Sequence, residues 1–356
     1  MCLRAGDFIF LRKRQMMKRQ MWVPVLGVLA ALLALTAGRA DRKEEGFTLP
    51  GYHNADAKFL GSHVITSVEE GIRILDLQGN TIRQYDGLSA SWLYVQEEAR
   101  SPQEETEGAD GGYTVAYSNH ANETHILRLT EELELLDDRL VLTTDTLAID
   151  PILIRDGDGW LLTHTCIEGT VNNPDPQGEN GVYMVKLYRS DNLKDWEYVT
   201  DIISRKHNLE DGDLRLADGK LCYFFEMEQY DKGPSAICVM VSGDGGETWS
   251  SPRELLPPVA DNEMASCEPT EDGWRLYVSS DYSCVGESYQ GASVYYADYT
   301  ADFEPVRTWC PSDMPDNRSV RLYEVKQTDG ALAFLFARNF LTDCDLLLRM
   351  LEKESD

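Results

Sequence analysis

The chain has 356 residues, of which 61 are acidic and 33 are Lys or Arg, so its formal net charge is −28. A surface of this charge repels nucleic acid and anionic membranes, which argues against a nucleic-acid partner and favours a soluble acidic protein. The length allows one large all-β domain or two ordinary domains.

An apolar run at residues 21–37 (MWVPVLGVLAALLALTA) follows a cluster of basic residues. Such a segment is typical of a secretory signal peptide or of a signal-anchor whose basic end stays in the cytoplasm. Small residues at Gly38 and Ala40 permit cleavage before Asp41. We therefore expect residues 1–40 to be a signal peptide or an anchor, and the rest to be secreted or held at the cell surface. A membrane is expected as a partner only through this segment, if it is not cleaved.

The first 40 residues contain seven basic residues and one acid, so the exported part carries 26 basic and 60 acidic residues. Its net charge is then about −34. This charge fits a solvated acidic exoprotein, and attraction of cationic ligands is the functional alternative.

After residue 41 helical periodicity is nearly absent, apart from an ambiguous stretch at residues 130–140. Short β-rich segments recur instead around turns at residues 156–159, 218–219, 272–273 and 329–330. A strand of similar texture follows each turn: WLLTHTC from Trp160, KLCYFFE from Lys220, WRLYVSS from Trp274 and ALAFLFA from Ala331. This recurrence predicts a β-propeller, in which each blade buries its faces only against its neighbours.

An acid precedes each turn, at intervals of 63, 55 and 56 residues: Asp150, Asp213, Glu268 and Glu324. Running the same period backwards adds a blade at Asp56 and another that begins near Ser91. The sequence therefore predicts one all-β domain at residues 41–356, a six-bladed propeller. An acidic stretch at residues 97–112 (EEARSPQEETEGADGG) is expected to be a flexible loop within blade two.

The segment Ser242-x-Asp244-x-Gly246-x-Thr248-Trp249 has the features of a tight turn. The Ser and Asp side chains can bond the backbone, glycine supplies a positive φ, and the Trp can pack between strands. This Asp-box, or BNR repeat, resembles the repeat of the sialidase (neuraminidase) superfamily of glycan-processing β-propellers. The resemblance implies a six-bladed sialidase-like fold over residues 50–354. The box has a structural role there and carries no chemistry.

Residues 190–196 (SDNLKDW) resemble the S-x-D-L-x-x-W variant found in glycosidases of families 32 and 43. Those enzymes have five blades, so a five-bladed propeller is the alternative fold.

The innermost strand of each blade lines the central channel of a propeller, and five predicted blades place a carboxylate at what we expect to be an equivalent position. Glycosidic cleavage needs one carboxyl group to protonate the leaving oxygen and another to act as base or nucleophile. We therefore predict an exo-acting glycoside hydrolase with an oligosaccharide or glycoconjugate substrate at the channel mouth. A non-catalytic glycan-binding or protein-interaction propeller is the alternative.

Asp150 and Glu268 each precede a proline, which biases the acid toward an extended conformation. Both resemble the inner-strand acids of family 43. The resemblance implies that Asp150 is the base or nucleophile, Glu268 the acid, and Asp213 the carboxylate that tunes the pKa of the acid. Glu226 and Glu228, at the end of the second strand of blade four, are reserve acids.

A sialidase holds the carboxylate of its substrate with three arginines and uses a Tyr–Glu pair as nucleophile, since bidentate Arg–carboxylate contacts orient the sugar. Here the early arginine motif is echoed only at residues 71–75 (GIRIL), and Tyr323 with Glu324 is a candidate pair. Each arginine is alternatively a surface or inter-blade ion-pair residue. The candidate substrate-binding residues are Asp56, Arg215, Glu324 and Arg321, with Arg338 as a further candidate.

No spacing in the sequence indicates a metal site or a cofactor-binding loop. Trp160 and Trp274 can stack on sugars or pack inside blades. Two cysteine pairs, Cys222 with Cys238 and Cys267 with Cys284, are candidates for disulfides or for buried small hydrophobic residues.

Overall fold

Every regular element in the described part of the chain is a β-strand. The computed structural model describes residues 45–97, 112–119, 122–169, 181–228, 234–282, 289–328 and 330–352. None of these residues belongs to a helix long and apolar enough to cross a membrane. The expected leader at residues 1–40 lies outside the described residues. So do positions 98–111 of the expected acidic loop, whose ends, Glu97 and Gly112, belong to strands.

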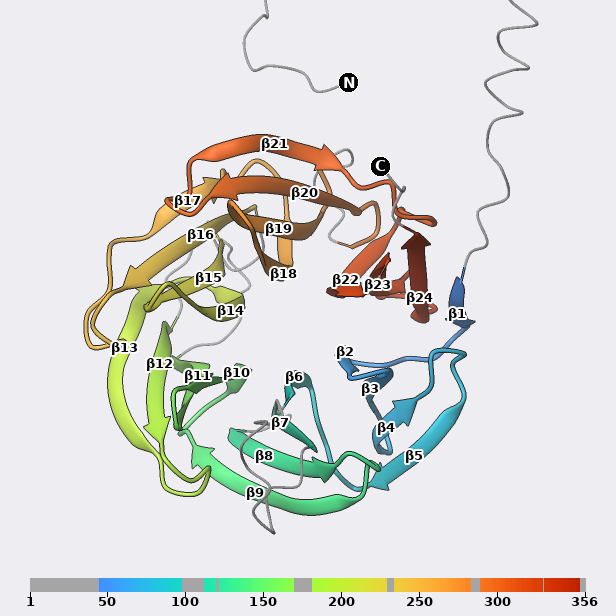
Figure 1. The fold of residues 1–356 in the computed structure, drawn as a ribbon, viewed down its shortest axis with the longest axis horizontal. Helices are drawn as coiled ribbons and strands as arrows, with labels where there is room; N and C mark the ends of the chain where they lie inside the picture. The colour runs from blue at the N-terminus through green and yellow to red at the C-terminus, as the bar shows by residue number, and fades with distance from the viewer. Residues whose placement is uncertain are drawn as a thin grey trace, which may run out of the picture. The chain divides into compact units, whose positions relative to one another are not determined.

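The described strands form six sheets of four strands each, arranged as the blades of a propeller (Figure 1). Blades one and two contain β2 (Ala57–Leu60), β3 (His63–Val68), β4 (Gly71–Leu75), β5 (Thr81–Asp86), then β6 (Trp92–Glu97), β7 (Gly112–Ser118), β8 (Glu123–Thr130) and β9 (Leu135–Thr143). Blades three and four contain β10 (Ala148–Asp156), β11 (Gly159–Glu168), β12 (Val182–Ser190), β13 (Glu197–Lys206), then β14 (Leu209–Ala217), β15 (Lys220–Glu228), β16 (Ser235–Ser242) and β17 (Arg253–Leu256). Blades five and six contain β18 (Asn262–Thr270), β19 (Gly273–Ser280), β20 (Ser293–Thr300), β21 (Pro305–Pro311), then β22 (Val320–Thr328), β23 (Ala331–Arg338), β24 (Asp345–Glu352) and β1 (Glu45–Leu49).

The predicted six-bladed propeller is therefore confirmed, and the five-bladed alternative is wrong. The ambiguous stretch at residues 130–140 contains the end of β8, a turn and most of β9, with no helix. The four strands that were expected after the Gly/Asp turns are β11, β15, β19 and β23.

The ring is closed by its N-terminal strand. The sheet of blade six has the order β1–β24–β23–β22, so β1 is its outermost strand although it comes first in the chain. Arg349 of β24 fastens this strand, because its Nη1 donates to the carbonyl oxygen of Phe47 at 2.7 Å and its Nη2 to Thr48 Oγ1 at 2.8 Å. The innermost strands of neighbouring blades are in contact all around the ring, including β22 of blade six with β2 of blade one.

The hydrophobic core is divided among the six interfaces between blades. Each of six buried clusters joins two neighbouring blades, as a meandering sheet with two apolar faces requires. Trp160 lies in the cluster between blades two and three, and Trp274 in the one between blades four and five. Both rings are almost fully buried, so these tryptophans pack between blades and are not sugar platforms.

The Asp-box residues form the turn between β16 and β17. Ser242 Oγ accepts a hydrogen bond from the Gly246 N–H at 2.9 Å, and Asp244 Oδ1 accepts one from the Thr248 N–H at 3.0 Å. Gly246 has a φ of +95°, and its carbonyl oxygen accepts the indole N–H of Trp249 at 3.0 Å. Because strands alternate in direction within a blade, this turn lies at the end of the blade opposite to the start of the inner strand.

Blade three repeats this turn with Asn192 in place of the aspartate. Its Oδ1 accepts the N–H groups of Lys194 and Asp195 at 2.8 and 2.9 Å, and Leu193 between them has a φ of +60°. The copy at residues 190–196 therefore keeps a turn held by a side chain, but its Asn192 accepts from the residues two and three positions on, whereas Asp244 accepts from the residue four positions on.

The cysteines of blade four lie on opposite faces of their sheet. Cys222 packs between blades four and five, whereas Cys238 packs between blades three and four, so they form no disulfide and act as small buried hydrophobic residues. Cys267 is likewise a free buried thiol, and Cys284 lies outside the described residues.

Candidate functional site

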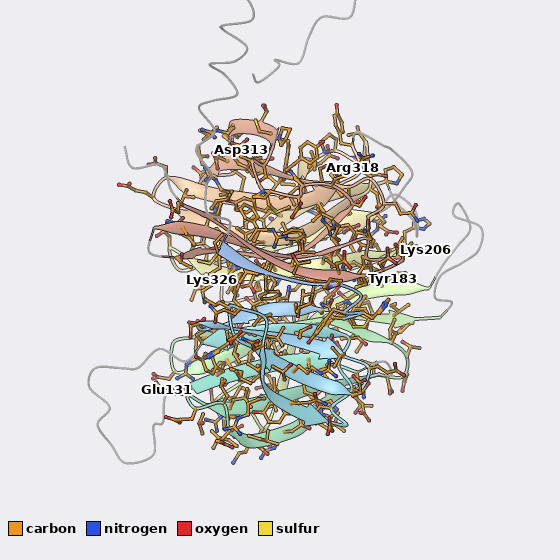
Figure 2. All side chains as sticks on the ribbon, turned by 90° about the vertical axis from the view of Figure 1, so that its right-hand side faces the viewer. Glu131, Tyr183, Lys206, Asp313, Arg318 and Lys326 are labelled. Atoms are coloured by element: carbon orange, nitrogen blue, oxygen red, sulfur yellow. The ribbon has the colours of Figure 1, made fainter. Side chains whose placement is uncertain are left out.

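The six inner strands surround a channel and start at the same end of it, which we call the mouth. In blade six, β22 starts two residues after Arg318 and passes Lys326 before it ends. Figure 2 shows these two residues on opposite sides of the propeller, with Tyr183 and Lys206 on the same side as Arg318. The mouth is therefore the end that carries Arg318.

Four inner strands have a β-bulge near the mouth. The strand pairing skips residues in β10, β14, β18 and β22: Asp150 and Pro151, Asp211 and Gly212, Ala265, and Tyr323. A bulge adds a residue to one strand and redirects its side chains, and bulges are common beside active sites. Asp150 and Asp211 have φ values of +49° and +47°, a left-handed conformation that costs free energy for a residue with a side chain.

The bulges change the register that the sequence suggested. Asp213 and Glu324 each lie four residues before the last paired residue of their strands, so they are equivalent. Glu268 lies two residues before that point and Asp150 lies six before it. The expectation that all the inner-strand acids occupy one equivalent position is therefore wrong, because Asp150 is nearer the mouth and Glu268 is deeper in the channel.

A cavity of about 120 Å³ lies in the channel and is lined by all six inner strands or the residues beside them. Six of the seven predicted catalytic and substrate-binding residues line it: Asp56, Asp150, Asp213, Arg215, Arg321 and Glu324. Glu268 does not line the cavity, but its Oε1 lies 3.8 Å from Nη2 of Arg215. The lining also includes the aromatic side chains of Trp92, Tyr94 and Tyr323.

The deeper part of the channel contains three acids and three basic residues, which we call the inner cluster: Asp213, Glu268, Glu324, Lys58, Arg215 and Lys326. Arg215 joins two of these acids, with its Nη2 at 2.8 Å from Asp213 Oδ2 and 3.8 Å from Glu268 Oε1. Lys326 is shared with an acid outside the cluster, since its Nζ lies 2.5 Å from Oε1 of Glu97. Each acid of the inner cluster therefore has a basic residue beside it that partly compensates its charge.

Glu324 is the inner-cluster acid whose titration is most changed. Its Oε2 accepts the N–H of Phe59 at 2.6 Å, which ties blade six to blade one. Burial raises the pKa of Glu324 to about 7, although Lys58 opposes this shift. A substantial fraction of this carboxyl group is therefore protonated at neutral pH.

Five acids gather nearer the mouth, and we call them the mouth cluster: Asp150, Glu210, Asp211, Glu226 and Glu263. Asp150 and Asp211 come from neighbouring blades, and the Asp211 N–H donates to Asp150 Oδ2 at 3.0 Å. Glu210 faces Glu226 across the β14–β15 pair. Burial is the main cause that raises the pKa of each of these five groups, and the charges of neighbouring acids add to it.

Arg321 is a cation beside the mouth cluster. Its guanidinium lies over the rings of Tyr289, Tyr323 and Phe340, with its Cζ at 5.3, 5.6 and 4.4 Å from the ring centres. The positive charge of Arg321 lowers the pKa of Glu210 and of Asp211, and that of Lys58 also lowers the pKa of Asp211. Two basic residues face five acids, so the mouth cluster carries an excess of negative charge when the acids are ionised.

Asp56 lines the cavity in a different role. Its Oδ1 accepts the N–H of Ala57 and its Oδ2 accepts the N–H of Leu93, both at 2.8 Å. Because Leu93 belongs to β6, Asp56 links blades one and two through the backbone.

Among the described residues, two arginines line the cavity, one fewer than the triad that a sialidase uses. Only Arg215 and Arg321 are among the residues that line the described cavity. Arg73 pairs with Glu70 at 3.1 Å, and Arg338 pairs with Asp345 at 3.2 Å. Both members of the candidate pair Tyr323–Glu324 line the cavity, where Tyr323 is the bulge residue and Glu324 Oε2 accepts the N–H of Phe59 in blade one.

Three members of the mouth cluster, Glu210, Asp211 and Glu263, were not selected from the sequence. Glu263 lies one residue inside the start of β18, and its Oε2 accepts the hydroxyl of Tyr289 at 2.6 Å. The dipeptide Asp211-Gly212 was a usable signal for a bulge, since glycine in a strand often marks one. Glu226, a reserve acid from the sequence, does reach the mouth cluster.

No protein-family model and no curated protein matches the chain. Among solved structures, the chain is similar to a protein of unknown function from Dyadobacter fermentans, with 9% identity, a TM-score of 0.56, and coverage of 83% of this chain and 86% of that chain. It also resembles an α-L-arabinofuranosidase from Fusarium graminearum in complex with an iminosugar inhibitor, with 9% identity, a TM-score of 0.49, and coverage of 73% and 92%. An exo-1,5-α-L-arabinanase from a bovine ruminal metagenomic library has 14% identity, a TM-score of 0.46, and coverage of 74% and 92%.

At this level of identity the likeness to the Dyadobacter protein concerns the fold alone. Propeller glycoside hydrolases are present among the structural neighbours, but their TM-scores are below one half. An assignment of activity therefore depends on the residues in the channel of this chain.

Proposed function

We propose that the chain is an exported glycoside hydrolase that acts on an oligosaccharide or glycoconjugate at the mouth of its channel. In this proposal Asp150 is the base or nucleophile and Glu324 is the general acid. The observation that carries it is that both carboxyl groups line one cavity from blades three and six, which lie opposite each other in a ring of six. A sugar ring between them would have a carboxyl group on each side, as glycosidic cleavage requires.

The position of Asp150 supports its role. The bulge holds its backbone at a φ of +49°, and the Asp211 N–H fixes one of its carboxylate oxygens. Residues held in sparsely populated backbone conformations are common at functional sites, where the surrounding structure holds them in the strained conformation. Burial and neighbouring acids raise the pKa of Asp150, and the Asp211 N–H opposes this rise, so the bond favours the ionised form that a base or nucleophile needs.

Glu324 suits the role of general acid better than Glu268, the residue predicted for that role in the sequence analysis. A general acid must be protonated at working pH, and the pKa of Glu324 is raised to about 7 by burial. Glu268 does not line the cavity, and although burial raises its pKa as well, the charge of the Arg215 guanidinium beside it opposes that rise. Asp213 forms an ion pair with the same Arg215 guanidinium and would set the position of that guanidinium.

The experiment is a screen of the full chain, produced in a secreting host, against aryl hexosides, pentosides and sialosides. The variants Asp150→Asn and Glu324→Gln keep the shape of each side chain and remove its charge. We expect Asp150→Asn to lower kcat/KM by about 10³-fold, in the range typical of a lost acid or base. We expect Glu324→Gln to lower it strongly for poor leaving groups and weakly for activated aryl groups, which need no protonation.

Two matched controls complete the design. Glu268→Gln tests the acid that the sequence favoured, and Glu247→Gln removes an exposed carboxylate at the outer turn of blade four. Turnover that persists in both Asp150→Asn and Glu324→Gln contradicts the proposed pair. Absence of turnover on every substrate, with glycan binding retained, favours a non-catalytic glycan-binding propeller.

A further inference from the structure

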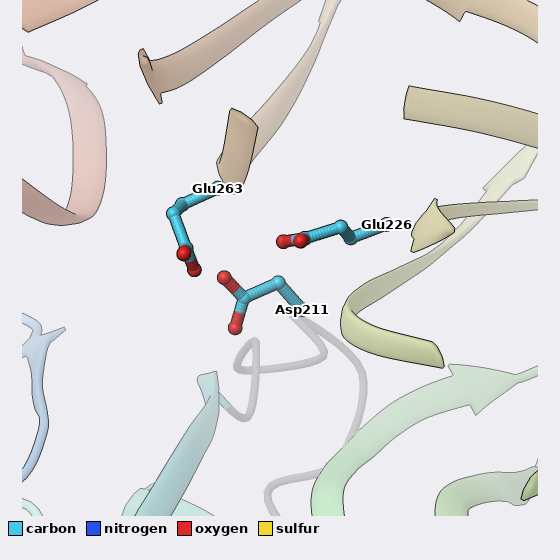
Figure 3. Close-up of side chains that lie close together, drawn as sticks. All are labelled: Asp211, Glu226 and Glu263. Atoms are coloured by element: carbon cyan, nitrogen blue, oxygen red, sulfur yellow. The ribbon is translucent and has the colours of Figure 1, made fainter. Parts of the chain in front are cut away.

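Three acids of the mouth cluster converge on one point. Asp211 of β14, Glu226 of β15 and Glu263 of β18 each offer a carboxylate oxygen, and these oxygens all lie within 4.8 Å of one another. Figure 3 shows the three side chains directed toward a common centre from two neighbouring blades. The separation leaves room for one ion between the oxygens, since Ca²⁺–oxygen distances are about 2.3–2.6 Å.

Glu226 gives an independent indication that a ligand is bound at this point. Its side chain is only 1% exposed, and neither of its carboxylate oxygens has a hydrogen-bond partner among the described residues. Figure 3 shows this carboxylate aimed at Asp211 and Glu263. A buried carboxylate without a partner is costly, so folded proteins neutralise it with a proton, an ion pair or a metal.

Neighbouring groups hold the other two acids, Asp211 and Glu263, in position. The Tyr289 hydroxyl donates to Glu263 Oε2 at 2.6 Å, which occupies one oxygen of that carboxylate and leaves the other for the centre. The bulge fixes the backbone of Asp211, whose N–H is bonded to Asp150. Supporting contacts of this kind usually hold the ligands of a metal site in position.

The local charge also favours a cation. The mouth cluster has five acids, and two described basic residues act on it: Arg321, which lies over three aromatic rings, and Lys58, whose Nζ donates to the carbonyl oxygen of Tyr323. The acids at the mouth therefore outnumber the basic residues that face them.

We propose that Asp211, Glu226 and Glu263 bind one hard divalent cation, Ca²⁺, at the mouth of the channel. An oxygen-only, carboxylate-rich set of ligands from flexible side chains suits Ca²⁺ better than metals that prefer nitrogen or sulfur. Three carboxylates leave coordination positions for water or for the hydroxyl groups of a ligand in the channel. This site does not depend on the proposed hydrolase activity, and it is absent from the sequence pattern because its ligands come from three strands.

The test measures Ca²⁺ binding by the full chain after treatment with EDTA and dialysis. Isothermal titration calorimetry is expected to show one site per chain with a Kd of about 10⁻³ M or tighter. Added Ca²⁺ is expected to raise the midpoint of thermal unfolding, because a ligand that binds only the folded state stabilises it. No saturable binding up to about 10 mM Ca²⁺ overturns the proposal.

The variant Glu226→Gln distinguishes a metal site from a cluster that shares protons. Without Ca²⁺ this variant is expected to be at least as stable as the wild type, since a buried carboxylate is replaced by a neutral group of the same shape. With Ca²⁺ the wild type gains stability and the variant does not, and its affinity falls by at least about 10-fold. Glu263→Gln is expected to behave in the same way.

Glu247→Gln is the control for diffuse binding to the acidic surface, and it is expected to bind Ca²⁺ as the wild type does. Equal loss of affinity in Glu247→Gln and Glu226→Gln, or unchanged affinity in Glu226→Gln, overturns the proposal. Because calorimetry and unfolding need no substrate, failure of this site is distinguishable from failure of the proposed hydrolase.

Discussion

Asp211 donates its backbone N–H to the Oδ2 atom of Asp150 at 3.0 Å, and both residues hold a left-handed backbone at a bulge of an inner strand. The bond joins blades three and four at the mouth of the channel. It links two acids that repel each other when ionised, since the charge of Asp211 raises the pKa of Asp150.

The first prediction concerns this bond and compares Asp150→Asn with Asp150→Ala. Both changes remove the same charge. The difference in stability between the two variants therefore reports the hydrogen bond and the cost of the left-handed backbone. Asn keeps a carbonyl acceptor for the Asp211 N–H and tolerates a left-handed conformation, whereas Ala does neither. We expect the Ala variant to be less stable than the Asn variant by about 1–3 kcal/mol, measured by urea unfolding.

Equal stability of the Asn and Ala variants would show that the bond between blades three and four contributes nothing measurable. The same comparison at an exposed aspartate with an ordinary backbone, Asp313→Asn against Asp313→Ala, is the control, because Asp313 has no left-handed φ.

The second prediction follows from the raised pKa of Glu324. If Glu324 is the acid, kcat/KM declines as pH rises through about 7, and Glu324→Gln loses this limb of the profile. Stability changes in the same window. The pKa of Glu324 is about 7 in the folded state against an ordinary 4.5, so its contribution is fully present below pH 4.5 and is lost as pH rises to about 7.

The stability half of this prediction needs no substrate. Urea unfolding at several pH values between 4.5 and 8 is expected to show the wild type losing stability relative to Glu324→Gln as pH rises. A constant difference between the two proteins across this range would mean that Glu324 titrates normally.

Much of the fold was predictable, because a propeller repeats one local pattern. The Gly/Asp turns located β11, β15, β19 and β23, and the acid spacing led to six blades. The register of the acids was harder to obtain. Asp150 and Glu268 were aligned because each precedes a turn. In the structure Asp150 lies six residues before the last paired residue of its strand and Glu268 lies two before it, and both strands have a bulge near the mouth. The two acids are therefore at different depths in the channel.

The site itself depends on contacts between blades that no local pattern encodes. Asp213 and Arg215 are two residues apart on one strand, so their pairing follows from strand periodicity. Asp211 and Glu263 meet only because β14 and β18 are neighbours in the ring, about 50 residues apart in the chain.

The third prediction concerns the Asp-box turn and the residue Gly246. A Cβ atom at this position would lie 2.3 Å from Leu187 Cδ2, and the φ of +95° is unfavourable for alanine. We expect Gly246→Ala to lower the free energy of unfolding by about 1–3 kcal/mol, the range for overpacking and backbone strain. In the same turn, Gly243 has no heavy atom within 4 Å of such a Cβ, so Gly243→Ala is expected to stay within about 0.5 kcal/mol.

The last prediction concerns the closure of the ring by β1. Gly46 lies in this strand with a φ of +132°, and a Cβ there would be 2.2 Å from the carbonyl oxygen of Leu348. Because that obstacle is backbone of β24, Gly46→Val is expected to detach β1 and leave β24 as an unpaired edge. Hydrogen exchange of the β24 amides should then become faster, while Thr48→Ser, which keeps the hydroxyl that binds Arg349, should leave it unchanged. Protection of β24 that survives in Gly46→Val would mean that the ring stays closed without its N-terminal strand.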